Sequence, residues 1–217
     1  MVIHAIPCNT QNYGGLRAQK VRYIVVHYTA GNRDTAAGNG TYFANNVVAA
    51  SAHYFVDEAQ VVASVPEQFV AWHCGGAAYV HQECRNSNSI GVEICSEKDA
   101  NGQYYFTDAT VELAQELIRQ LMEKYDVPVE RVIRHYDVTG KICPAPFVGA
   151  GLDAWEEFKG GLIMYPKLEN VPDWARQTIA KLMEKDLLRG DEKGNLNLSK
   201  DMTRTMVILD RAGVFDK

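Results

Sequence analysis

The chain has 217 residues, of which 47% are hydrophobic and 23% are charged, a balance typical of a folded globular protein. Its formal net charge of -5 argues against nucleic acid as the main partner, because nucleic-acid-binding domains usually carry a basic surface. No apolar run approaches the roughly 18 residues that a membrane-spanning helix needs. The length suits one domain with a small additional module.

Short strand patterns alternate with helix patterns through the first 165 residues. Strands are expected at 21–27, 52–57, 60–64, 89–95 and 131–135. The clearest helix is expected over 108–125, where apolar residues recur at helical spacing after a capping Thr107-Asp108 pair. Another helix should begin near Asp153 and carry Trp155 and Phe158. This pattern predicts an α/β fold with a mixed central β-sheet flanked by helices.

The composition of the sequence changes after Tyr165-Pro166-Lys167, so we divide the chain into a domain of residues 1–165 and a helical module of residues 166–217. Two helices are expected in the module, one after Pro172 and one capped by Ser199. Their apolar stripes are Val171, Trp174, Ala175, Ile179 and Leu182, and Met202, Met206, Leu209 and Ala212. A helical hairpin this small buries little apolar area, so it should dock on the main domain or pair with another copy.

Two segments far apart in the sequence carry side chains that bind metals. His27 ends an apolar run, His135 follows the apolar Val132-Ile133 pair, and Cys143 lies in a Gly-Lys-Ile-Cys-Pro loop. Two imidazoles and a thiolate with the fourth position open form the usual catalytic zinc site, which acidifies water and polarises a carbonyl. Each residue also has a simpler explanation: His27 as a hydrogen-bonded histidine at the core edge, and Cys143 as an inert buried thiol.

Five segments in the same order resemble the zinc-dependent N-acetylmuramoyl-L-alanine amidases of phage and bacteria, which share a fold with peptidoglycan recognition proteins. They are His27-Tyr28-Thr29-Ala30, Ser51-Ala52-His53-Tyr54-Phe55-Val56-Asp57, Ala71-Trp72-His73-Cys74-Gly75, Asn88-Ser89-Ile90-Gly91-Val92-Glu93 and Lys141-Ile142-Cys143-Pro144. The third segment has cysteine where the family motif has alanine. The resemblance spans about residues 20–160 and implies a Zn²⁺ cofactor bound by His27, His135 and Cys143.

The resemblance also implies the reaction, which is hydrolysis of the amide bond between N-acetylmuramic acid and L-alanine in peptidoglycan. Lys141 would stabilise the developing oxyanion, although a solvated surface lysine is the ordinary alternative. Glu93 resembles a catalytic glutamate and is favoured as the general base. His53 stands where many relatives carry a tyrosine, and we expect it to polarise the carbonyl or contact the substrate. The division of roles between Glu93 and His53 stays open.

Three more residues are expected to line the substrate cleft by the same resemblance. His73 resembles a substrate-contacting residue of the family's Trp-His-Ala-Gly loop. Trp72 either stacks on a sugar or packs in the core. Asn88 either lines the cleft or forms a turn. Asp137 either orients His135 or serves as a turn residue.

The C-terminal module resembles a single S-layer homology unit, a family associated with cell-surface polymers. The matching residues are Asp173-Trp174-Ala175, Ile179-Ala180-Lys181-Leu182, Gly190 and Met202-Thr203-Arg204. The resemblance implies wall binding, and dimerisation through the module is an equally weighted alternative. Every residue expected to act in the chemistry precedes residue 144.

Other functions stay open from the sequence. A non-catalytic peptidoglycan-binding protein of the same fold is the main alternative, although such proteins typically lose the cysteine-type ligand. A cysteine peptidase using Cys143 and His135 is disfavoured by Pro144 and by the lack of a recognisable nucleophile-bearing helix start. The expected setting is a phage or prophage endolysin or a bacterial autolysin.

The start of the sequence shows no secretory signal, so we expect synthesis in the cytoplasm and action on the wall after release. The chain has five cysteines. Cys74 and Cys84 flank a glycine-containing loop and could pair in an oxidising compartment. Free thiols are the favoured expectation for a chain without an export signal.

Overall fold

The computed structural model describes residues 1–149 and 152–216, which form two compact units, Met1–Glu156 and Glu157–Lys217. The boundary between the units falls within α4 (Leu152–Leu162). It therefore precedes the division after residue 165 that we drew from composition, which stays a prediction.

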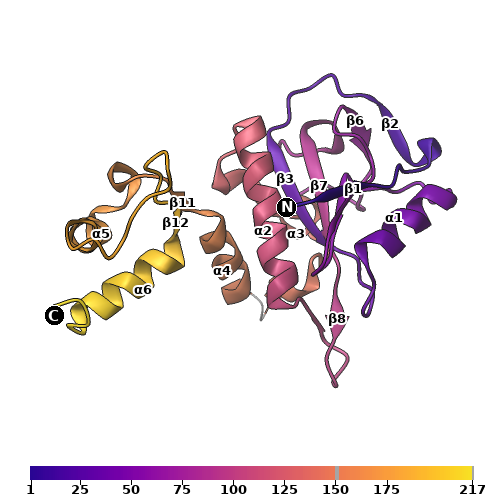
Figure 1. Cartoon of the computed structure of the whole chain (residues 1–217). Coiled ribbons are helices and arrows are strands. Elements are labelled where there is room, and N and C mark those ends of the chain that lie inside the picture. The colour runs from indigo at the N-terminus through magenta and orange to yellow at the C-terminus, as the bar shows by residue number, and fades with distance from the viewer. Residues whose placement is uncertain (150–151, 217) are drawn as a thin grey trace. The chain divides into compact units, whose positions relative to one another are not determined.

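The first unit is built on a six-stranded mixed sheet with the strand order β1-β5-β4-β7-β3-β10. Figure 1 labels β1, β7 and β3 of this sheet. The six strands are β1 (Ile3–Ala5), β3 (Tyr23–Tyr28), β4 (Tyr54–Val56), β5 (Val61–Ala63), β7 (Ser89–Ile94) and β10 (Val132–Arg134). The neighbouring strands β4, β7, β3 and β10 run parallel, and β5 is antiparallel to β4. The expected α/β fold with a mixed central sheet is confirmed, and each of the five expected strands overlaps an observed one.

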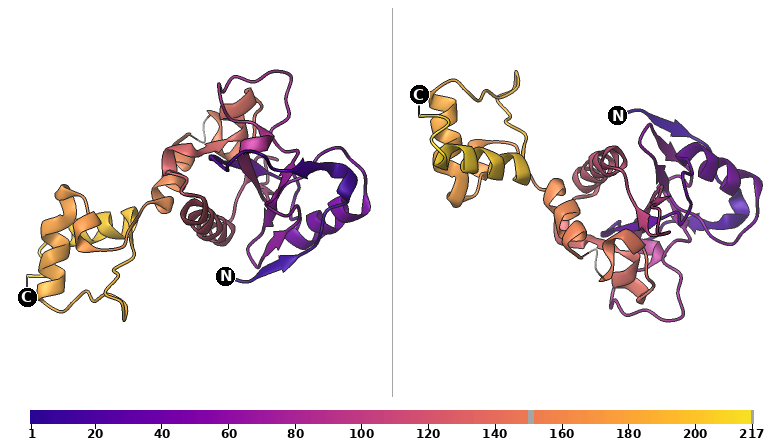
Figure 2. Two further views of the ribbon diagram at one scale, coloured as in Figure 1. Left: turned by 90° about the horizontal axis from the view of Figure 1, so that it is seen from above. Right: turned by 90° about the horizontal axis from the view of Figure 1, so that it is seen from below.

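Strand β3 lies between β7 and the edge strand β10, and its Ile24, Val25 and Val26 are fully buried. Strands that are covered on both faces read as continuous apolar runs, which is why this segment was recognisable. Two helices cover the two faces: α1 (Ala36–Asn45) contacts β4 and β5, and α2 (Asp108–Tyr125) contacts β7, β3 and β4. Figure 2 shows α2 on one side of the sheet and α1 on the other.

Helix α2 follows its sequence pattern at both ends. The Thr107 side chain accepts a hydrogen bond from the Thr110 amide, and Asp126 adopts a left-handed conformation directly after the last turn. Helix α1 was not expected, because glycine and asparagine are poor helix formers. Its first turn is capped by Thr35 and by Asp57, whose Oδ2 accepts from the Ala36 amide at 2.8 Å. A carboxylate that is distant in sequence thus stabilises α1.

The remaining elements are short. Residues Tyr13–Leu16 (β2) pair with Phe69–Ala71 (β6), and Glu97–Lys98 (β8) pair with Tyr104–Tyr105 (β9). Helix α3 (His135–Thr139) follows β10 directly. Among the described residues, no helix combines the length and the apolar character that a membrane span requires.

The second unit contains α5 (Asp173–Glu184), α6 (Lys200–Arg211) and a small antiparallel ribbon of β11 (Met164–Tyr165) and β12 (Leu198–Ser199). Its core consists of Val171, Ala175, Ile179, Leu196, Leu198 and Val207. The expected stripe on the first helix is right except for Trp174, which is 48% exposed. On α6 the expected stripe is not the buried face, because Met202 and Leu209 are exposed while Thr203 and Val207 are buried.

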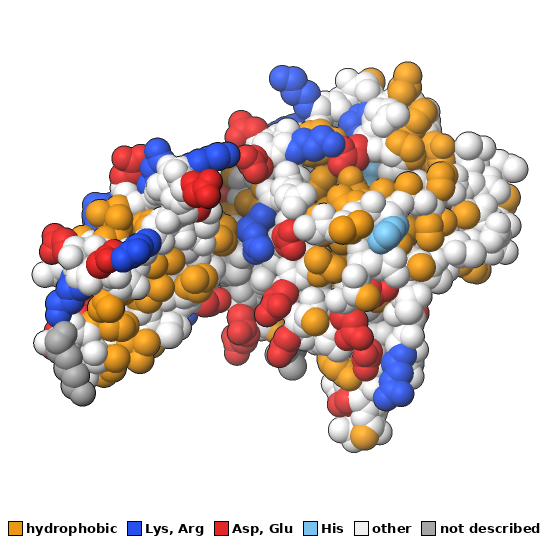
Figure 3. Space-filling view, in the orientation of Figure 1, with side chains coloured by type: hydrophobic (Ala, Val, Ile, Leu, Met, Phe, Trp, Pro, Cys, Tyr) orange, Lys and Arg blue, Asp and Glu red, His pale blue; other side chains and the backbone are white. Residues whose placement is uncertain are grey.

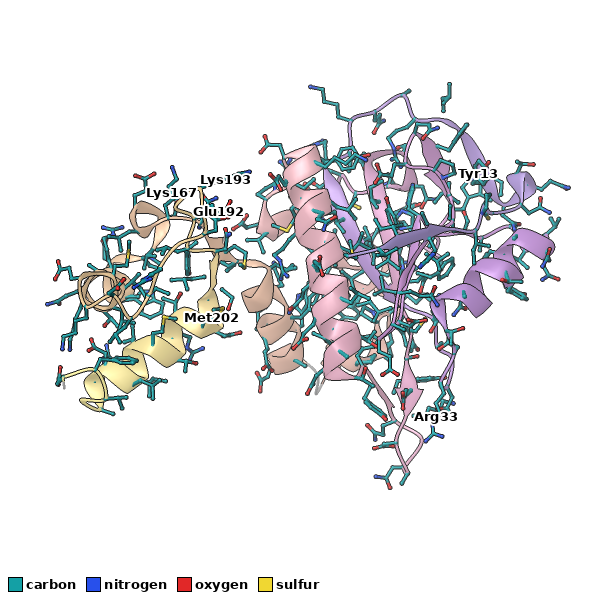
Figure 4. The ribbon with its side chains drawn as sticks, viewed as in Figure 1. Tyr13, Arg33, Lys167, Glu192, Lys193 and Met202 are labelled. Atoms are coloured by element: carbon teal, nitrogen blue, oxygen red, sulfur yellow. The ribbon has the colours of Figure 1, made fainter. Side chains whose placement is uncertain are left out.

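The orientation of α6 has a polar cause. Thr203 Oγ1 donates to the Ser199 carbonyl, and Asp210 accepts hydrogen bonds from Thr178 Oγ1 and Lys181 Nζ of α5. Met202 is exposed in this orientation; Figure 4 labels it near the start of α6. Apolar side chains are visible over this unit in Figure 3.

Candidate metal centre and active site

The candidate site lies where three neighbouring parallel strands end. His27 lies near the carboxyl end of β3, Glu93 near that of β7, and His135 directly after β10. His27 and Glu93 are register partners, and Glu93 is in turn the partner of Phe55 on β4. Register partners on adjacent strands project their side chains to the same face of a sheet, so His27, Glu93 and Phe55 all lie on one face.

The third ligand candidate reaches this edge through a tight loop after β10. Gly140, with φ of 77°, ends α3 in a left-handed conformation that glycine adopts without strain. The chain then returns, and the Tyr136 amide donates to the Cys143 carbonyl at 2.8 Å. This closure places Cys143 beside His27, with Sγ 3.6 Å from Nδ1. The His27 and His135 ring centroids are 4.7 Å apart.

His27, His135 and Cys143 form a buried group whose candidate ligand atoms all lie within 4.8 Å of one another. A separate observation shows that the group fits a metal ion. His135 Nε2 lies 2.9 Å from the Gly75 carbonyl, to which it donates, while His135 Nδ1 is buried without a hydrogen-bond partner among the described residues. An imidazole held by a backbone carbonyl with its other nitrogen free is the usual arrangement of a metal ligand.

The electrostatics keep the two histidines neutral. Burial, together with the positive charge of Lys141, lowers the pKa of His135 to about 4. Burial also holds the pKa of His27 well below its usual range, with the neighbouring His73 adding to the effect. Neutral imidazole is the form that binds a metal. Burial raises the pKa of the Cys143 thiol to about 12, with the charge of Glu93 adding to it, so metal binding by Cys143 would release a proton.

A cavity of about 290 Å³ opens over this group. Its lining residues are His27, Tyr28, Thr29, Ala30, Asn39, Phe43, Ala50, Ser51, Phe55, Trp72, His73, Glu93, His135, Lys141 and Cys143. Helix α1 supplies Asn39 and Phe43, so the cavity lies on the face of the sheet that α1 covers. A larger depression of about 680 Å³ lies elsewhere, around Arg17, Glu67 and Lys124, and none of its lining residues is a member of the metal-ligand group.

Glu93 and Lys141 are the charged residues at this cavity. Glu93 Oε2 is buried and has no hydrogen-bond partner among the described residues. Burial raises the pKa of Glu93 to about 8, and the charge of Lys141 opposes that rise. Lys141 is exposed at the rim, and its charge acts on His27, His135 and Cys143 as well. The cavity therefore holds an unpartnered carboxyl group, which is mainly protonated at neutral pH, together with an ammonium group at its rim.

Trp72 and His73 both line the cavity, and Trp72 is 37% exposed there. His73 is buried, with Nδ1 3.0 Å from His27 Nε2 and Nε2 3.2 Å from Ser89 Oγ. Gly91 is required at this point, because a Cβ on it would lie 2.5 Å from the His73 ring. The structure thus brings His73 against a metal-ligand candidate, a contact that the sequence did not reveal.

His53 and Asn88 are not brought to the cavity. His53 is fully buried, its Nδ1 accepts from the Gly91 amide at 3.0 Å, and its Nε2 faces Arg17 and the Phe69 carbonyl. The side chain of Asn88 bonds the Arg85 amide and the Glu83 carbonyl within its own turn. Their predicted catalytic and substrate-contacting roles stay predictions without a cavity contact in their favour.

Several contacts at the site left no signal in the sequence. The Gly75 carbonyl orients His135, and a backbone atom is invisible to motif reading. The sequence pattern indicates only a strand position for Ser89, yet its hydroxyl contacts His73. Asp137 does not orient His135: its carboxylate accepts from the Arg134 amide at 2.8 Å and pairs with the Arg134 guanidinium.

Comparison with known proteins agrees with this geometry. The family model described as N-acetylmuramoyl-L-alanine amidase matches residues 17–146. The chain belongs to this family of α/β amidases. Its relatives include BlyA of Bacillus subtilis (strain 168), an N-acetylmuramoyl-L-alanine amidase, which is 38% identical over 157 residues, covering 66% of this chain and 41% of BlyA. The amidase CwlL of Bacillus licheniformis is 38% identical over 157 residues, covering 68% of this chain and 42% of CwlL.

Solved structures extend the comparison to the fold. The catalytic domain of XlyA is 28% identical with a TM-score of 0.62, covering 75% of this chain and 100% of that domain. The structure of PlyL is 29% identical with a TM-score of 0.61, covering 75% of this chain and 97% of PlyL. The chain therefore spans about two fifths of BlyA and CwlL but nearly all of these two structures. The family model ends before the second unit, whose resemblance to an S-layer homology unit stays a prediction.

Proposed function

We propose that this chain is a zinc-dependent amidase that hydrolyses the bond between N-acetylmuramic acid and L-alanine in peptidoglycan. One observation carries the proposal: His27, His135 and Cys143 meet in one cavity with Glu93 and Lys141, in a chain of the amidase family. Such a set provides three protein ligands, a candidate base and a candidate oxyanion donor within one pocket.

The donor set favours zinc among the common divalent metals, because two imidazoles and one thiolate suit a borderline-soft ion. When bound with an open position, zinc acidifies water and polarises a carbonyl. The protein supplies the fixed geometry for this chemistry. The Gly75 carbonyl holds the ring of His135, and the loop closed by the Tyr136–Cys143 backbone hydrogen bond holds the thiol.

Glu93 is the residue best placed to hold and pass on a proton. Glu93 lines the cavity, and its Oε2 has no hydrogen-bond partner among the described residues, so it is available to a water or a substrate amide. In the proposed reaction the ionised form of Glu93, which the charge of Lys141 favours, takes a proton as water attacks the carbonyl and gives it to the leaving amine of L-alanine. The strand position of Glu93, in register with His27, keeps this carboxylate beside the ligands.

Lys141 would stabilise the negative charge that develops on the attacked carbonyl oxygen. It lines the cavity two positions before Cys143, and its charge influences every member of the ligand group. A fixed donor of this kind typically contributes a factor of about 10² to 10³ in rate. Trp72, partly exposed at the same cavity, offers a flat apolar face on which a sugar ring can stack.

For the C-terminal module the proposal is wall binding or self-association. Its support is the number of large apolar side chains that are exposed on this unit, namely Trp174, Met183, Leu187, Met202, Ile208, Leu209 and Val214. Apolar side chains that are exposed together on one surface are typical of interaction sites. The proposed setting is a phage or prophage endolysin or an autolysin, made in the cytoplasm and acting on the wall after release.

Metal analysis of the purified chain, combined with mass spectrometry of digested peptidoglycan, tests the proposal. We expect one zinc per chain and stem peptides that begin with a free L-alanine amine, released from intact glycan strands. Cleavage within the glycan or within the peptide would contradict the assigned bond. Binding to peptidoglycan without any product would instead support a non-catalytic binding protein.

A further inference from the structure

The two ring nitrogens of His27 face different partners. Nδ1 lies 3.6 Å from Cys143 Sγ, on the side of the ligand group, and Nε2 lies 3.0 Å from His73 Nδ1. A neutral imidazole carries one proton, so only one of these nitrogens has a free lone pair. The position of that proton decides whether His27 can bind a metal on the Cys143 side.

The proton can be located by following the hydrogen bonds outward from His27. His73 Nε2 lies 3.2 Å from Ser89 Oγ, and Ser89 Oγ donates to the Arg85 carbonyl at 2.7 Å. A hydroxyl has one proton, and the carbonyl takes it, so Ser89 Oγ accepts from His73 Nε2. His73 is then unprotonated on Nδ1, and Nδ1 accepts the proton on His27 Nε2. His27 Nδ1 keeps its lone pair, directed toward Cys143.

One competing donor lies close to this chain of hydrogen bonds. Cys74 Sγ is 3.2 Å from His73 Nδ1 and 3.7 Å from Ser89 Oγ. A thiol is a weak donor, and the imidazole N–H of His27 at 3.0 Å is the stronger one. His27, His73 and Cys74 also lie close enough together to be potential metal ligands. The hydrogen bond between the two histidines, however, occupies the nitrogens that a second metal would need.

We propose that His73 is a positioning residue that holds His27 in the tautomer able to bind the metal through Nδ1, with Ser89 setting the tautomer of His73 itself. The inference rests on the proposed zinc site and assigns His73 a place behind a ligand, in addition to its place at the cavity wall. The Gly75 carbonyl likewise holds the proton of His135 on Nε2, so both histidine ligands would bind the metal through Nδ1. Burial makes the relay rigid: Ser89 is fully buried and His73 is 7% exposed.

The most direct test is nitrogen-15 NMR of the histidine rings in the zinc-loaded full-length chain. Long-range proton–nitrogen couplings distinguish the two tautomers of each ring. We expect His27 and His73 both to carry the proton on Nε2, and His27 Nδ1 to show the shift of a metal-bound nitrogen. A proton on Nδ1 of His73, or metal on Nε2 of His27, would overturn the proposal.

Variants provide a second readout that does not depend on hydrolysis. His73→Ala should weaken zinc binding about 10- to 100-fold in competition with a chelator, the usual effect of losing a ligand's outer partner. His73→Asn should retain more affinity, because its Oδ1 can accept where Nδ1 did. Cys74→Ala is the matched control: it removes the neighbouring thiol but leaves the relay intact, and zinc affinity should not change.

The outcomes separate this inference from the proposed function. A folded His73→Ala protein that binds zinc as tightly as the unchanged chain would overturn the positioning role while leaving the amidase proposal intact. A loss of affinity in Cys74→Ala equal to that in His73→Ala would place the thiol in the relay and contradict our assignment. If His73→Ala does not fold, the tautomers measured in the unchanged chain decide. Failure of the unchanged chain to bind zinc would overturn both.

Discussion

His27 of β3 and Glu93 of β7 are register partners on adjacent parallel strands, so a metal-ligand candidate and a half-buried carboxyl group share one row of the sheet. The pairing is rigid because each of the two strands has a second parallel neighbour. Strand β3 also pairs with β10, and strand β7 also pairs with β4. The two side chains therefore keep a fixed spacing at the cavity, which is what a base acting beside a metal requires.

Cys143→Ala should remove the metal from the site. Two neutral histidines alone would bind zinc far more weakly than the set with a thiolate, so we expect the purified variant to contain little zinc. Elemental analysis measures it. Cys8→Ala is the control, since Cys8 is buried in a different cluster outside the cavity and the metal content should not change. Full zinc occupancy in Cys143→Ala would disprove this ligand set.

Glu93→Ala and Lys141→Ala should each slow peptidoglycan hydrolysis by about two or more orders of magnitude, the scale of a lost base or oxyanion donor. Both variants should retain zinc, because neither residue belongs to the ligand group. The exposed residues Lys20 and Glu130 provide charge-matched controls, and their alanine variants should hydrolyse peptidoglycan at the rate of the unchanged chain. Turnover near that of the unchanged chain in either test variant would reject the role assigned to that residue.

The thiols should be unreactive in the folded protein. All five cysteines are free and buried. Cys74 and Cys84 belong to one apolar cluster, in which burial and the Cys84 thiol hold the pKa of Cys74 well above its usual range. A thiol reagent should therefore react with almost none of the cysteines in the native, zinc-loaded protein and with all 5 after unfolding with a chelator. A count of about 3 after unfolding would reveal a disulfide between two of them.

Stability should fall in acid partly because of Glu67. Burial alone would raise the pKa of Glu67, but hydrogen bonds from Lys124, Tyr125 and Tyr54 outweigh it and lower the pKa. A carboxyl group whose pKa is lower in the folded state stabilises the fold above its unfolded pKa of about 4.3, and this contribution is lost as the pH falls through the folded value.

Glu67→Gln should therefore cost about 1 to 3 kcal/mol in the free energy of unfolding at pH 7. The difference from the unchanged chain should shrink as the pH falls from the unfolded pKa of about 4.3 through the lower pKa of Glu67 in the folded state. Urea unfolding at a series of pH values measures both quantities. Glu130→Gln, on an exposed side chain, is the control. A difference that does not vary with pH would show that the lost charge is not the cause.

Truncation after Lys167 should leave the chemistry intact, because the ligand group, Glu93 and Lys141 all lie in the first compact unit. We expect the shortened chain to fold, by circular dichroism, and to cleave a soluble muropeptide. It should bind intact walls less well, or become monomeric if the full chain is a dimer. Wall pull-down and light scattering on both chains measure this. Loss of muropeptide cleavage with unchanged wall binding would place the module within the catalytic fold.

Much of the fold was readable because it depends on local pattern. The apolar run of β3 predicted a strand, and the period of α2 with its Thr107 cap predicted that helix with the correct bounds. The ligands His27, His135 and Cys143 were predicted as a set because their residue types and order resemble one family. Chemistry carried by side-chain identity is visible in a sequence even when its members are distant.

Tertiary structure alone decided which neighbours each side chain meets. Helix α1 has poor intrinsic propensity and depends on the distant Asp57 at its first turn. His73 and His53 are both buried histidines, yet only His73 reaches the ligand group, because Gly91 leaves room for its ring. Residue type and periodicity determine which groups are present and which face they occupy. The hydrogen bonds of His27 to His73 and of His135 to the Gly75 carbonyl arise only when separate strands and loops pack together.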